Sequence, residues 1–71
     1  MLRLARLREW REKFALSQAD LARMIGSTQA TVSRIERGYA ARPSTTRRLA
    51  RALKVRPADL MAGERVQEDG A

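Results

Sequence analysis

The stretch "ARMIGSTQATVSRIE", residues 22–36, joins two helical patterns at a single glycine, Gly26. After this glycine only Val32 and Ile35 are large and apolar, and they stand three positions apart. That spacing predicts a helix with a narrow buried stripe. Its other side chains are small or polar, so most of its circumference is predicted to face outward.

The first helix of this pair is predicted to run from residue 18 to 25. Ser17 is its expected N-cap, and Asp20 stands at the third helical position, where a carboxylate can complete a capping box. Gly26 is expected to end the helix, because glycine readily adopts the left-handed backbone that closes a last helical turn.

The second helix is predicted over residues 28–37, with either Thr28 or Ser27 as its cap and Gly38 at its end. Only about three residues separate it from the helix before. A connection this short holds two helices at a steep angle, which is the geometry of a helix-turn-helix.

Around this pair the rest of the chain also has helical patterns. Apolar residues at three- and four-residue steps predict a first helix over residues 2–14. The side chains expected on its core face are Leu4, Leu7, Trp10 and Phe14. Residues 38–43 are predicted to form a loop, after which Ser44 caps a helix over residues 45–53. Pro57 opens a short fifth helix.

The predicted fold is therefore all-α, a compact bundle of five short helices with a central helix-turn-helix. Residues 1–63 form one domain, and residues 64–71 are an acidic tail that we expect to be disordered.

The charge balance suits a polyanionic partner. Lys and Arg number 15 against 8 Asp and Glu, which gives a net charge of +7. Residues 1–63 carry +9 of this and residues 64–71 carry −2. Such a basic body is typical of nucleic-acid-binding domains, although an arginine-rich surface also serves solubility.

The composition argues against several other classes. The chain has no cysteine and no histidine, so we expect no metal site, no cofactor and no enzyme activity. Its apolar runs are far shorter than the ~20 residues that a membrane span needs. A soluble, cytoplasmic protein is the expectation.

The outward face of residues 28–37 has side chains that suit a DNA major groove. Gln29 can pair in a bidentate way with adenine, Ala30 can contact a thymine methyl, and Arg34 can fork onto guanine. Gln18, in the first turn of the preceding helix, is placed to meet a phosphate. Hydroxyl groups such as those of Thr28 and Thr31 can add phosphate contacts.

The segment "LSQADLARMIGSTQATVSRIERG", residues 16–38, resembles the helix-turn-helix of phage Cro and lambda-type repressors, the xenobiotic-response-element class of bacterial regulators. The resemblance extends over residues 7–60 and implies a lambda-repressor-like DNA-binding domain. It implies base contacts by Gln29, Ala30, Ser33 and Arg34. It implies phosphate contacts by Gln18, Arg37, Tyr39 and Arg42. It also implies a structural ion pair between Arg11 and Glu36.

At some positions the chain departs from the family or leaves two readings open. The family often has Gly or Asn where Ala15 stands, so Ala15 is expected to be strained if its backbone is left-handed. Trp10 and Phe14 are expected in the core and not as a base-stacking platform. Tyr39 can either pack on its loop or give its hydroxyl to a phosphate.

The functional expectation is a sequence-specific transcriptional regulator, a repressor that binds a twofold-symmetric operator as a homodimer. Helix five, around Leu60 and Met61, is the expected dimer contact. An alternative is an antitoxin-like protein-binding module, although the tail is short for wrapping a toxin.

Overall fold

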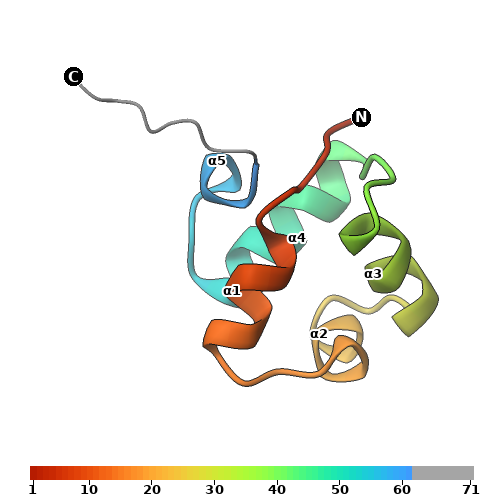
Figure 1. The fold of residues 1–71 in the computed structure, drawn as a ribbon, viewed down its shortest axis with the longest axis vertical. Helices are drawn as coiled ribbons and strands as arrows, with labels where there is room; N and C mark the ends of the chain where they lie inside the picture. The colour runs from red at the N-terminus through yellow and green to blue at the C-terminus, as the bar shows by residue number, and fades with distance from the viewer. Residues whose placement is uncertain (62–71) are drawn as a thin grey trace.

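The structure is a computed structural model that describes residues 1–61. The predicted acidic tail lies outside the described residues. This part of the chain is all-helical in its regular structure, as predicted. Its five helices are α1 (Leu7–Lys13), α2 (Gln18–Met24), α3 (Gln29–Glu36), α4 (Pro43–Leu53) and α5 (Pro57–Leu60) (Figure 1).

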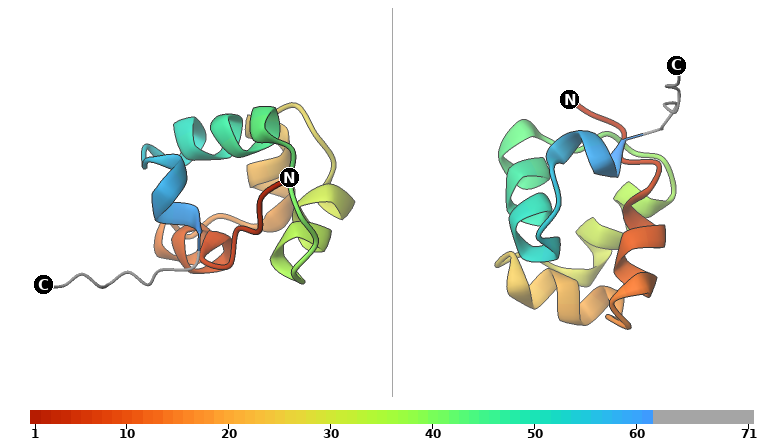
Figure 2. Two further views of the ribbon diagram at one scale, coloured as in Figure 1. Left: turned by 90° about the horizontal axis from the view of Figure 1, so that it is seen from above. Right: turned by 90° about the vertical axis from the view of Figure 1, so that its left-hand side faces the viewer.

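A single core holds the helices together. α2 packs mainly on α3, and α5 packs on α4, with α1 and α4 closing the bundle (Figure 2). Each helix contributes at least one fully or nearly fully buried apolar side chain. The largest buried apolar side chains of the core, which include one from the segment before α1, are Leu4, Leu7, Leu21, Val32, Leu49, Leu53 and Leu60. The rigid frame that results carries α3 on one edge of the molecule.

The predicted N-caps of α2 and α3 are present. The Ser17 hydroxyl accepts a hydrogen bond from the Asp20 N–H at 2.9 Å, and the Ser17 N–H donates to the Asp20 carboxylate at 3.1 Å. At α3 the Thr28 hydroxyl accepts from the Thr31 N–H at 3.2 Å. These caps satisfy N–H groups that have no partner inside their helices, and they set the start of both α2 and α3.

Gly26 and Gly38 end α2 and α3 with positive φ values of 68° and 110°. In each case the residue after the glycine donates its N–H back to a carbonyl five residues earlier. This is the Schellman arrangement, formed by Ser27 to Ala22 at 2.9 Å and by Tyr39 to Arg34 at 3.1 Å.

The same arrangement ends α1 and α4 without glycine. Ala15 has φ 55° and Lys54 has φ 58°. The left-handed backbone suggested for Ala15 is therefore present. The one at Lys54 was not predicted, because the residues around it contain no glycine or asparagine to indicate it.

The N-terminal helix was predicted too long. α1 starts at Leu7, and Leu2 instead pairs antiparallel with Ala41, with N–H to carbonyl distances of 2.7 and 2.6 Å. Leu4 is still buried, at 2% exposure. Leu4 has helical spacing with the residues of α1, and this spacing led to the wrong start of the helix. Its side chain is buried instead by an extended segment that hydrogen-bonds to the loop before α4.

Two residues do not lie where they were predicted. Phe14 was expected in the core, and Leu60 was expected at the dimer contact. Phe14 is 50% exposed, because α1 ends before it and its ring only stacks on half-buried Trp10 at 6.4 Å between centroids. Leu60 has no exposed area, so it belongs to the core and is not available to a second copy.

The start of α4 was also predicted wrongly. Pro43 is the first helical residue and Arg42 is the N-cap, so Ser44 lies inside the first turn and is not the cap. Proline suits this place because its fixed φ is helical and its missing N–H would have had no partner.

Candidate nucleic-acid interface

α3 is fixed to the molecule by a narrow stripe and presents its other side outward. Val32 and Ile35 are 0% and 4% exposed and face the core. The exposed residues of its N-terminal half include Thr28, Gln29 and Ala30, and Arg34 is exposed one turn further on. Thr31 and Ser33 are half-buried at the edges of this face. The predicted base-contacting side chains therefore share one outward ridge.

An almost buried ion pair ties α1 to the C-terminal end of α3. Arg11 donates from Nε and Nη2 to the two carboxylate oxygens of Glu36, at 2.6 and 3.1 Å. Their side chains are 11% and 4% exposed. The pKa of the Arg11 guanidinium is raised above its ordinary value, chiefly by the hydrogen bonds to Glu36. Arg11 also donates to the Leu16 carbonyl at 2.7 Å, so its position is fixed on both sides.

Gln18 links this ion pair to the outward ridge. Its side-chain amide donates to Glu36 at 3.0 Å, and its carbonyl oxygen accepts from the Gln29 amide at 3.5 Å. One N–H of the Gln18 amide has no acceptor among these contacts. Gln18, Gln29 and Glu36 form one connected network. The network was not predicted from the sequence, because it depends on the crossing of α2 and α3.

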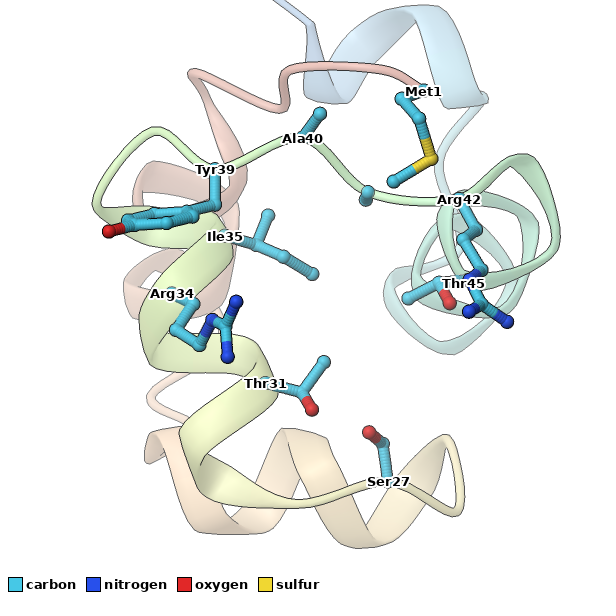
Figure 3. Close-up of a pocket in the computed structure, with 10 residues that line it drawn as sticks. Met1, Ser27, Thr31, Arg34, Ile35, Tyr39, Ala40, Arg42 and Thr45 are labelled. Atoms are coloured by element: carbon cyan, nitrogen blue, oxygen red, sulfur yellow. The ribbon is translucent and has the colours of Figure 1, made fainter.

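Beside the ridge lies a concavity of about 620 Å³ between α3 and the start of α4 (Figure 3). Four of the predicted contact residues line it, namely Thr31, Arg34, Tyr39 and Arg42. The other lining residues, which were not predicted as contacts, are Met1, Ser27, Ile35, Ala40, Ala41 and Thr45. Met1 is there because the Leu2–Ala41 bridge brings the N-terminal segment to this face, and no local sequence signal indicates that bridge.

Pairing of charges leaves the surface around α3 positive. In residues 1–61 each of the five carboxylates is within 4.0 Å of an arginine, and the pairs are Arg6–Glu9, Arg8–Glu12, Arg11–Glu36, Arg23–Asp20 and Arg56–Asp59. Within that part of the chain Arg34, Arg37 and Arg42 have no carboxylate at that distance. Their charge is therefore available to an anionic ligand.

Within residues 1–61, no three His, Cys, Asp or Glu side chains gather closely enough to hold a metal ion. None of the helices seen in this part of the chain combines the length and the apolar character required to cross a membrane.

Comparison with known proteins agrees with this geometry. The family model described as "Helix-turn-helix" matches residues 7–60. The fold is similar to the crystal structure of the P22 c2 repressor in complex with synthetic operator 9T in the presence of Tl⁺. That match has a TM-score of 0.79 and 29% identity, and covers 90% of this chain and 98% of the repressor chain. No curated protein sequence matches this one. The chain belongs to the Cro/C1-type helix-turn-helix family of DNA-binding transcription regulators.

Proposed function

We propose that this protein is a sequence-specific repressor of transcription that reads the DNA major groove with α3. The observation that carries the proposal is the outward ridge, which Val32 and Ile35 anchor from behind. It is flanked by arginines that have no carboxylate partner among residues 1–61. The similar structure of a repressor bound to its operator supports the same use of the fold.

The ridge offers three kinds of base contact. Gln29 is suited to bidentate pairing with adenine, Ala30 to contact with a thymine methyl, and Arg34 to a fork onto guanine. Ser33 is half-buried at the edge of the ridge, so it can reach only a base that lies next to that edge. Each good bidentate pair discriminates against a wrong base by about 1–3 kcal/mol.

Groups around the ridge are proposed to fix the domain on the DNA backbone. The unused N–H of the Gln18 amide can donate to a phosphate while the rest of that amide stays bound to Glu36 and Gln29. The remaining proposed phosphate contacts are Thr28, Thr31, Arg37, Tyr39 and Arg42.

A single recognition helix covers only a few base pairs, so we propose that two copies bind a twofold-symmetric operator with half-sites ~34 Å apart. Repression would follow from occupation of a promoter. A protein that acts on bacterial DNA in this way works in the cytoplasm.

The test is selection of bound fragments from a random DNA pool, followed by anisotropy titrations at several salt concentrations. Arg34→Ala should weaken the selected site by about 1–3 kcal/mol and relax the preference at one base pair. Arg42→Ala should weaken all sequences alike and reduce the slope of log affinity against log salt by about 1.

Arg8→Ala is the matched control, because it removes the same charge from an exposed ion pair on α1. It should leave the selected sequence unchanged. Recovery of no preferred sequence by the unaltered protein would refute the proposal, and a preference unaffected by Arg34→Ala would refute the assignment of the ridge.

A further inference from the structure

The end of α3 brings two functional side chains together. Gly38, at φ 110°, allows its own N–H to bond to the Ile35 carbonyl at 3.0 Å and the Tyr39 N–H to bond to the Arg34 carbonyl at 3.1 Å. In a Schellman turn the longer backbone hydrogen bond joins two residues five positions apart. The side chains of these two residues often touch, and the contact is usually apolar. Here the pair is an aromatic ring and a guanidinium, Tyr39 and Arg34.

The two side chains are within cation–π distance. The guanidinium carbon of Arg34 lies 5.2 Å from the centre of the Tyr39 ring, inside the range of about 6 Å for this interaction. The guanidinium of Arg37 is further from the same ring, at 6.0 Å. In residues 1–61 no carboxylate within 4.0 Å of Arg34 competes for it.

The Tyr39 ring lies outside the core. The residue is 56% exposed and lines the same concavity as Arg34. Figure 3 shows both side chains on α3 and the loop that follows it, with the Arg34 guanidinium turned toward the concavity.

We propose that the Tyr39 ring positions the Arg34 guanidinium for base recognition and so sets specificity at the base pair that Arg34 contacts. This inference rests on the proposed function. Stacking uses the flat face of a guanidinium, whereas its N–H groups point outward in the plane, so a stacked arginine can still fork onto a guanine edge. Holding a long, flexible side chain in one orientation also reduces the entropy lost when it binds.

Two substitutions separate this role from a phosphate contact by the hydroxyl. Tyr39→Phe keeps the ring and removes the hydroxyl, whereas Tyr39→Leu removes the ring and leaves an apolar side chain. The measurement is the ratio of affinities for the selected site and for a site changed at the Arg34 base pair. Tyr39→Leu should lower this ratio about two- to fivefold, the size expected of an exposed cation–π contact. Tyr39→Phe should preserve the ratio, whatever it does to affinity for DNA in general.

A double variant and a DNA-free measurement complete the design. In an Arg34→Ala background, Tyr39→Leu should change the ratio no further, because the side chain it positions is gone. In the free protein, the NMR shifts of the Arg34 δ-methylene should show the ring current in the unaltered protein and in Tyr39→Phe, and lose it in Tyr39→Leu. Phe14→Leu, which removes another half-exposed ring just after α1, should leave the ratio unchanged.

The inference is overturned if Tyr39→Leu discriminates as well as the unaltered protein, or if Tyr39→Phe loses as much as Tyr39→Leu. Either result would leave the proposed function standing, provided that the unaltered protein still selects a sequence. If it selects none, the proposed function and this inference fail together.

Discussion

Replacing Arg11 by methionine should remove a large share of the free energy of unfolding. Within residues 1–61, the substitution leaves the Glu36 carboxylate, 4% exposed, with a single side-chain partner, the Gln18 amide at 3.0 Å. It also leaves the Leu16 carbonyl without the Arg11 donor at 2.7 Å. Removing one partner of a buried ion pair costs about 3–5 kcal/mol, because the other charge stays buried without compensation.

This loss is comparable with the whole stability of a small domain. A chain of 71 residues is expected to have a free energy of unfolding of about 4–11 kcal/mol. We therefore expect Arg11→Met to be only partly folded in buffer. Its unfolding is best measured in urea with an excluded osmolyte such as sucrose in all samples. The fluorescence of Trp10, whose indole N–H donates to the Asp59 carbonyl at 2.8 Å, reports on the packing of α1 against α5.

The matched control is the double variant Arg11→Met with Glu36→Leu. Replacing both members of a buried pair by apolar residues of similar size is often neutral or stabilising. The double variant should therefore be more stable than Arg11→Met alone, and helical circular dichroism should follow the same urea curve as the fluorescence. A loss below 1 kcal/mol for Arg11→Met, or a double variant no more stable than the single one, would refute the reasoning.

Three further predictions concern helix ends and one tertiary hydrogen bond. Ala15→Gly should stabilise the protein by up to about 1 kcal/mol, because the left-handed backbone of Ala15, with φ 55°, strains an alanine but not a glycine. The midpoint of thermal unfolding should rise by a few degrees. A fall in the midpoint would contradict the strain argument. The pKa of Asp20 is lowered, chiefly by the backbone N–H of Ser17, so its stabilising effect is complete above about pH 4 and is lost as the pH falls through the lowered pKa. Asp20→Asn should therefore lose urea resistance at pH 7, and this loss should shrink as the pH falls below about 4; a loss that does not change with pH would contradict this. Trp10→Phe removes the donor to the Asp59 carbonyl and should cost about 1 kcal/mol, with faster amide exchange in α5; unchanged exchange would show that the bond does not hold α5 in place.

Local sequence determined the helix-turn-helix. Ser17 and Asp20 cap a helix within three residues of each other, and Gly26 and Gly38 provide the backbone conformation that closes the two helices. These interactions act between near neighbours in the chain, so they are the same wherever the segment is placed. For that reason the outward ridge of α3 could be predicted from residues 22–36 alone.

Contacts between distant segments decided the remaining features. The Leu2–Ala41 bridge shortens α1 and brings Met1 to the concavity, and Lys54 adopts a left-handed backbone as the chain turns into α5. The network from Glu36 through Gln18 to Gln29 forms only when α2 and α3 cross. In the bridge and in the network the decisive partner is remote in sequence, and the free energy gained by burying apolar side chains in the common core brings the two partners together.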